Sequence, residues 1–182
     1  LSVGRITPSK GHDLIINVVS DLIKSGLDLK LKIIGGVIQD YHLKYLESLK
    51  KLVNDLKIDE SVEFSGPVSS DEMPEYLRTS EILINAVPFG GLDKVVLEAM
   101  ATKTPVVVTR KGGIPLAVKD GVNGLFIRPR NPKEISEKVN LLLKDEILRT
   151  KIGQRARKTI IERFTWEKVA HRYERIYNEF RK

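Results

Sequence analysis

The sequence contains no cysteine, which excludes disulfide bonds, a thiolate nucleophile and a cysteine-ligated metal. Long apolar runs are also missing, because no stretch approaches the roughly 20 residues that a membrane-spanning helix needs. The histidines, His12, His42 and His171, show no ligand spacing, so we expect each to be a surface or packing residue. Neither the P-loop, the dinucleotide-binding Gly-x-Gly-x-x-Gly nor the hydrolase Gly-x-Ser-x-Gly motif occurs. Asp-x-Asp, a carboxylate pair that holds a divalent metal on a nucleotide diphosphate, is absent too.

What is present is the composition of a soluble globular domain, with 41% hydrophobic and 30% charged residues in a chain of 182. The net charge of +7 comes from the end of the chain: residues 128–182 carry 16 basic and 8 acidic side chains. There the cations alternate with glutamates at helical spacing, which favours a solvated helical face, and no aromatic residues interleave for nucleic-acid binding. We expect a cytoplasmic protein without a nucleic-acid partner; peripheral contact with an acidic membrane surface stays an alternative for the basic end.

Short apolar runs alternate with amphipathic stretches along the chain. Continuous apolar runs bounded by turn residues predict buried strands at 1–3, 29–34, 62–64, 82–85, 105–109 and 124–127. Apolar stripes at helical spacing predict helices at 11–25, 41–56, 71–77, 93–101, 132–143, 146–163 and 165–180. This alternation is typical of an α/β fold with a doubly wound, Rossmann-like parallel sheet. Ligands of such sheets bind beyond the carboxyl ends of the strands, so the loops that follow the strands are the candidate site.

The loop after the first strand, Gly4–Gly11, holds two cations at one mouth of the sheet. Arg5 offers a guanidinium fork and Lys10 an ammonium, and together they suit a diphosphate. Ordinary solvent-facing charge is the alternative, since the loop matches no phosphate-binding motif.

The loop after the fourth strand combines glycines with a helix start. Gly90 and Gly91 allow close approach of a ligand to the backbone, and Asp93 is a plausible cap of a helix whose free amides suit an anion. Glu98 lies in an otherwise apolar helical stretch, where its carboxylate matches the two hydroxyls of a ribose. An exposed position, or a structural bond to backbone amides, is the alternative for Glu98. The next loop, 110–115, again joins glycines to a helix start, and it either walls the same site or is a plain connection.

Three stretches of sequence together resemble a known family. VGRITPSKG, then GGLDKVVLEAMATKTPVVVT with GGIPLAVKDGVNGLFI, and finally FTWEKVAHRYERIY are similar to the donor-binding half of family 4 glycosyltransferases, in the family's order and spacing. The resemblance covers essentially the whole chain. It implies the carboxyl-terminal half of a two-domain GT-B enzyme, which transfers a sugar from a nucleotide-sugar with retention at the anomeric carbon, without a metal or another cofactor.

The resemblance also implies roles for individual residues. Arg5 and Lys10 are expected to bind the donor diphosphate and to stabilise the leaving group, and Glu98 to bind the ribose hydroxyls. The base pocket is expected near Pro67. The further donor-binding positions that it implies are Gly4, Gly66, Val68, Gly90, Gly91, Leu92, Asp93, Lys94 and Val95.

One position departs from the family pattern. The family usually carries a first glutamate eight positions before the second, and this chain has Gly90 there. That glutamate contacts hydroxyls of the transferred sugar, so its loss leaves the donor sugar undetermined. Asp93 is a candidate substitute, unless the helix cap occupies it.

The division of the chain follows from the same resemblance. Residues 1–164 are expected to form the donor domain, and the helix of residues 165–182 to pack on an amino-terminal acceptor domain that the chain lacks. The chain is therefore expected to be a piece of a longer protein that binds a UDP-, GDP- or ADP-sugar and, alone, transfers nothing. Its acceptor is a saccharide or a lipid-linked sugar held by the missing domain.

Two other functions remain open from the residues alone. One is a non-catalytic α/β module that binds a nucleotide or a protein, which Gly90 would favour. The other is a sugar-phosphate enzyme such as a phosphorylase or a nucleotide-sugar epimerase, which would need a pyridoxal lysine or a catalytic carboxylate pair that the sequence does not display.

Overall fold

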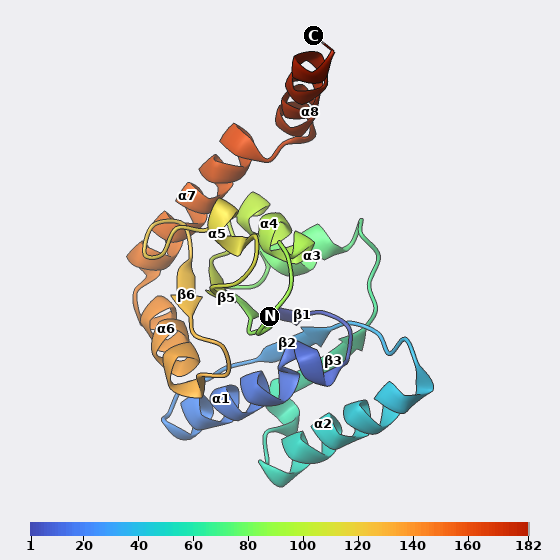
Figure 1. Cartoon of the computed structure of the whole chain (residues 1–182). Helices are drawn as coiled ribbons and strands as arrows, with labels where there is room; N and C mark the ends of the chain where they lie inside the picture. The colour runs from blue at the N-terminus through green and yellow to red at the C-terminus, as the bar shows by residue number, and fades with distance from the viewer. Residues whose placement is uncertain (182) are drawn as a thin grey trace.

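The computed structural model describes residues 1–181, and its strands all run parallel (Figure 1). They are β1 (Ser2–Val3), β2 (Leu31–Ile34), β3 (Val62–Gly66), β4 (Leu83–Asn85), β5 (Val106–Thr109) and β6 (Leu125–Ile127). Hydrogen bonds join them as two three-stranded units within the described residues, in the orders β1-β2-β3 and β4-β5-β6. The six predicted strands are thereby confirmed, with ends that differ by at most two residues.

Leu1 connects the two units edge to edge. Its amino group donates to the Ile82 carbonyl, and its own carbonyl accepts the Ile84 amide, both at 2.9 Å. These bonds set β1 beside β4, so the strands follow one another as β3-β2-β1-β4-β5-β6. This is the doubly wound order, and the predicted α/β fold is confirmed. The strand order reverses between β1 and β4.

The helices cover both faces of the strands. They are α1 (His12–Lys24), α2 (Leu43–Asp55), α3 (Met73–Arg78), α4 (Lys94–Ala101), α5 (Ile114–Ala117), α6 (Pro132–Lys144), α7 (Glu146–Arg163) and α8 (Trp166–Phe180), with short 3-10 turns at Pro8–Lys10, Asp40–His42 and Asp59–Ser61. The predicted helices are confirmed. The pattern does not predict α5, because four residues are too few to show a helical period.

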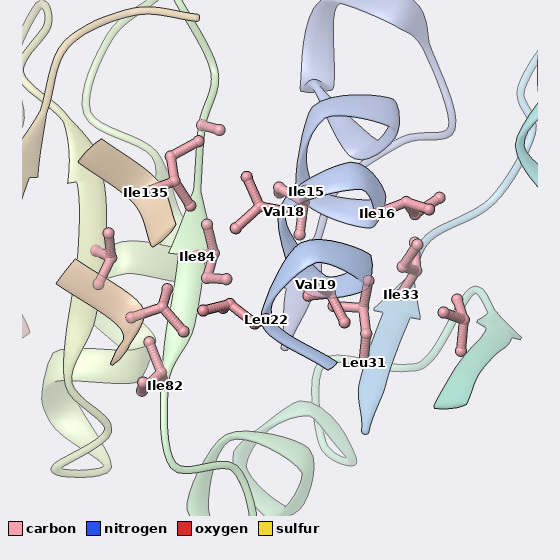
Figure 2. Packing of buried hydrophobic residues seen from close by; sticks show 14 of the residues in the cluster. Ile15, Ile16, Val18, Val19, Leu22, Leu31, Ile33, Ile82, Ile84 and Ile135 are labelled. Atoms are coloured by element: carbon pink, nitrogen blue, oxygen red, sulfur yellow. The ribbon is translucent and has the colours of Figure 1, made fainter. Parts of the chain in front are cut away.

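Two apolar clusters form the core, one on each face. Figure 2 shows Ile15 and Leu22 of α1 packed between β2 and β4, and Ile135 of α6 belongs to the same cluster. The other cluster joins β4 and β5 to α3, α4 and α7. Val107 of β5 belongs to the first cluster and Val106 to the second, and both are fully buried. Burial on both faces explains why the strands read as continuous apolar runs.

The last helix, α8, leaves the body of the domain (Figure 1). None of its residues is buried, and Trp166 and Phe180 at its two ends are 87% and 86% exposed. Its start is nevertheless well formed, since the Thr165 hydroxyl accepts the Lys168 amide. Among residues 1–181, no helix has both the length and the apolar character that crossing a bilayer demands.

This division between core and projecting helix predicts a large loss of stability for one alanine substitution and almost none for another. Ile33→Ala removes a fully buried side chain from β2 and should cost about 2–5 kcal/mol of unfolding free energy. Trp166→Ala on α8 should change it by no more than about 0.5 kcal/mol. Urea unfolding followed by circular dichroism measures both. A large loss for Trp166→Ala would mean that α8 packs on the domain in solution.

Candidate functional site

The loops that follow β1, β2 and β4 meet at the carboxyl edge of the sheet. Gly11, at φ 70°, starts α1, and a Cβ there would lie 3.4 Å from the Ala86 carbonyl oxygen after β4. On the other side, a Cβ at Gly35 would collide with the Gly4 carbonyl oxygen. Glycine is required at Gly35 by this close approach, and it is favoured at Gly11 by the positive φ, so both positions hold the loop of Gly4–Gly11 at the point where the strand order reverses.

Arg5 and Lys10 stand in this loop as the sequence predicts. A Cβ at Gly4 would lie 3.1 Å from Cδ of Lys10, so the aliphatic stem of Lys10 crosses Gly4 closely. The turn that carries Lys10 is closed by its amide, which donates to the Thr7 carbonyl at 3.0 Å. Within residues 1–181, neither Arg5 nor Lys10 forms an ion pair with a carboxylate. Two cations without a counter-ion at a strand-order reversal suit an anionic ligand.

The ring of His12 makes two hydrogen bonds, one of them to the loop of Gly4–Gly11. Its ring is buried, with Nδ1 3.1 Å from the Ser2 hydroxyl and Nε2 3.2 Å from the Arg5 carbonyl oxygen. Desolvation lowers the pKa of His12 below its usual value, so the ring is neutral near pH 7. Because a carbonyl can only accept, Nε2 carries the proton and donates to Arg5, and Nδ1 accepts from Ser2. The prediction of a packing role is confirmed for His12.

The loop after β3 lies beside the loop after β2. The Gly35 amide donates to the Gly66 carbonyl at 2.9 Å, and a Cβ at Gly36 would touch the Pro67 ring at 3.5 Å. Gly66 has φ 69° and open space around it. The half-buried Val68 packs against the same core cluster as Leu92 and Val95 of the fourth loop and its helix. Of the predicted positions, Val68, Leu92 and Val95 therefore pack on this cluster.

Glu98 is paired within its own helix. Its Oε1 lies 3.1 Å from the ammonium of Lys94, one turn earlier, and its side chain is 31% exposed. The Lys94 side chain is largely exposed, and such pairs contribute only about 0.2–1 kcal/mol. Of the alternatives weighed for Glu98, the bond to backbone amides is wrong for the described residues: the carboxylate is partly exposed and pairs with Lys94.

The predicted capping role of Asp93 is wrong. Asp93 occupies the cap position of α4, but its side chain makes no capping hydrogen bond. Its Oδ2 instead accepts from the ammonium of Lys111 at 2.8 Å. The Lys111 side chain is only 4% exposed, and a buried ammonium needs a carboxylate more than a neutral amide does.

Sequence reasoning missed Lys111. It appears in the sequence only as the second of two adjacent cations after β5, which is also a common surface pattern. In the structure its ammonium also donates to the Phe89 carbonyl at 3.1 Å and lies 3.4 Å from where a Cβ of Gly90 would be. A Cβ at Gly112 would collide with the Gly90 carbonyl oxygen, so the fifth loop passes directly against the exposed Gly90 and Gly91 of the fourth. The loop of residues 110–115 therefore packs directly against the loop of residues 86–93.

Two cavities lie elsewhere in the domain. One, of about 410 Å³, is at the amino ends of the strands between Lys30 and Ile82, and another, of about 770 Å³, lies between α5 and α7. Neither is lined by Lys10 or Glu98. The candidate site between these residues therefore belongs to the open carboxyl edge and to neither cavity.

Comparison with known proteins matches this chain to one family. Residues 1–159 match the family described as Glycosyl transferases group 1. The chain belongs to this family. Its fold is that of the carboxyl-terminal, Rossmann-like domain of GT-B glycosyltransferase structures.

Relatives and solved structures agree on the extent of the match. A D-inositol 3-phosphate glycosyltransferase of Streptomyces bingchenggensis is 30% identical over 98% of this chain and 40% of its own length. The carboxyl-terminal domain of a glycosyl transferase group 1 family protein from Francisella tularensis, solved alone, is 25% identical with a TM-score of 0.81, over 91% of this chain and 85% of that one. Anabaena HepE in complex with UDP has a TM-score of 0.90 at 19% identity, over 98% and 48%. The chain spans about half the length of the curated relatives it matches.

The neutral His12 predicts a pH dependence of stability. Its folded pKa lies below the unfolded value near 6.5, so the unfolded chain binds the extra proton and His12 costs stability as the pH falls through 6.5. His12→Gln loses this dependence. The difference in unfolding free energy between wild type and His12→Gln should therefore shrink from pH 7.5 to pH 5, measured by urea unfolding. A constant difference would mean that His12 titrates normally.

Proposed function

We propose that this domain is the donor-binding half of a retaining, metal-independent family 4 glycosyltransferase that holds a nucleotide-diphospho-sugar. The observation that carries the proposal is the pair of cations without counter-ions, Arg5 and Lys10, at the reversal of strand order. Across that reversal lies the start of α4, whose cap side chain leaves the amides of Lys94 and Val95 without a side-chain partner. Cations on one side and free amides on the other suit a diphosphate between them.

The chemistry follows from where charge develops. When the bond between sugar and diphosphate breaks, negative charge grows on the departing phosphate oxygens. Arg5 and Lys10 neutralise that charge. The amides of Lys94 and Val95 and the positive end of the α4 dipole stabilise it further. Glu98 exchanges its pairing with Lys94 for the two ribose hydroxyls. The base extends toward positions 66–68 along the same edge.

The donor nucleotide is a UDP-, GDP- or ADP-sugar under this proposal. Anabaena HepE, whose fold this chain shares, was also solved with UDP-glucose. In the present chain the sugar meets Gly90 in place of a carboxylate, and Asp93 is held by Lys111. Asp93 is therefore no substitute for the missing glutamate. Backbone amides of the loop after β4 bind the transferred sugar instead.

The test is a calorimetric titration with UDP, GDP and ADP in EDTA. One of them should bind, and Lys10→Ala should weaken that nucleotide about 10- to 100-fold, because a charge-assisted phosphate bond contributes about 1.5–3 kcal/mol. The affinity for the matching nucleoside, which lacks phosphate, should fall by less than about twofold. Lys24→Ala, an exposed lysine at the far end of α1, is the matched control and should change neither. Equal losses for nucleotide and nucleoside, or binding only with added metal, would contradict the proposal.

We also propose that residues 165–182 serve to pack on an acceptor-binding half that carries a saccharide or lipid-linked sugar. The exposed large apolar side chains of α8 are Trp166, Tyr173, Ile176, Tyr177 and Phe180. Residues 165–182 carry five basic and three acidic residues, a net charge of only +2, so this segment has little attraction to an acidic membrane. Residues 128–163 carry 11 basic and 5 acidic side chains, and any peripheral membrane contact is expected there instead.

The single tryptophan of the chain reports on this helix. In the isolated domain Trp166 should emit like tryptophan in water, and vesicles of acidic lipid should leave its emission unchanged, because α8 is built for a protein surface. In the full-length enzyme its emission should shift to the blue and resist quenching by acrylamide. A blue shift caused by acidic vesicles would show instead that α8 binds the membrane.

A further inference from the structure

Among the lysines and arginines of the described residues, Lys111 alone is buried. Its ammonium is almost fully buried, yet it lies under a loop whose tip, Gly90, is exposed. It donates to the Phe89 carbonyl at 3.1 Å and to Oδ2 of Asp93 at 2.8 Å. These two bonds tie together the two ends of the segment Phe89–Asp93. Lys111 thus contacts both ends of the loop segment that leads into α4.

The backbone of Asp93 is already set for capping. Its φ of −71° and ψ of 124° are those of a helix cap, and only the side chain points elsewhere. The Val96 amide donates to the Asp93 carbonyl at 3.0 Å, which leaves the amides of Lys94 and Val95 without a side-chain partner. A rotation of the Asp93 side chain would therefore suffice to cap α4.

The same residue type behaves differently where no buried lysine competes. Asp145 stands at the cap of α7 and accepts the Leu148 amide at 2.8 Å. Asn131 and Thr165 likewise cap α6 and α8 with their side chains. Asp93 thus differs from these three α-helix caps, although Thr7, at the cap of the short 3-10 turn Pro8–Lys10, also makes no capping bond. At Asp93 the ammonium of Lys111 takes the place of the helix amides as partner.

We propose that Lys111 is a positioning residue that withholds the Asp93 carboxylate from the start of α4, so that the first amides of the helix stay open to the diphosphate of the donor. A carboxylate at that helix start would compete with the phosphate both for the amides and through its negative charge. That the anion is a donor diphosphate rests on the proposed function. The withdrawal of Asp93 by Lys111 stands on the geometry alone.

The first experiment is a rescue. Lys111→Met replaces the ammonium by an uncharged side chain of similar length, frees Asp93 to cap α4, and should weaken the nucleoside diphosphate about tenfold. Adding Asp93→Ala removes the competing carboxylate and should restore the affinity to within about threefold of wild type. Lys119→Met, which removes an exposed lysine and the same charge, should bind like wild type. Unchanged binding by Lys111→Met, or no recovery in the double variant, would overturn the proposal.

The second experiment needs no nucleotide. In Lys111→Met one of the amides of Val95 and Val96 should exchange with deuterium about tenfold more slowly than in wild type, because a cap side chain accepts from the second or third amide of its helix. Asp93→Ala in the wild-type background should leave exchange of both amides unchanged, whereas Asp145→Ala should speed exchange of Leu148. This comparison stays available if Lys111→Met does not fold. Faster exchange of Val95 or Val96 in Asp93→Ala would overturn the proposal.

The two experiments separate this inference from the proposed function. Failure of the wild-type domain to bind any of the three nucleotides would contradict the proposed function, and the exchange measurements would still decide the role of Lys111. Nucleotide binding together with unchanged exchange in Lys111→Met would contradict the role of Lys111 alone.

Discussion

The hydrogen bonds of Leu1 with Ile82 and Ile84 determine where a ligand can bind in this domain. They put β1 beside β4, although about 80 residues separate the two strands in sequence. By the general rule for doubly wound sheets, the ligand crevice lies beyond the carboxyl ends of the strands on either side of such a reversal, here β1 and β4. Every residue to which we assign a role in charge compensation lies in the loops that follow β1, β4 and β5 or at the start of α4.

The crevice works because backbone and charge are arranged differently on its two sides. On the β1 side, glycines bring the chain close to its neighbours, the neutral His12 donates to the Arg5 carbonyl, and neither Arg5 nor Lys10 forms an ion pair within residues 1–181. On the β4 side, the buried Lys111 engages the Asp93 carboxylate. An anion entering the crevice therefore meets cations on one side and uncapped amides on the other, and the carboxylate that could repel it is already neutralised.

Most of the fold could be predicted from the sequence because it rests on local patterns. Burial of β5 on both faces makes Val106–Thr109 a continuous apolar run, and the stripe of α1 repeats at helical spacing. Arg5 and Lys10 could be predicted for a similar reason, since a loop after a buried strand must lie at the carboxyl edge. The position of Glu98 on a helix could be predicted as well, because the apolar pattern of residues 93–101 predicts α4.

The pairing of Asp93 with Lys111 could not be predicted in this way. Asp93 has every local feature of a helix cap, and the residue that overrides it lies 18 positions later in a different loop. The choice depends on burial of the lysine, which follows only from the close passage of Gly112 against Gly90. Local propensity fixes the backbone of Asp93, and tertiary contact fixes its side chain.

The central claim is that a nucleoside diphosphate binds in the crevice between β1 and β4. Amide chemical-shift mapping of the labelled domain during titration with the nucleotide that it binds tests this most directly. The account predicts that the largest shifts fall on residues 4–11, 66–68 and 90–95, at the carboxyl ends of the strands. Shifts concentrated at the opposite end, around Lys30 and Ile82, or in the cavity between α5 and α7, would contradict it.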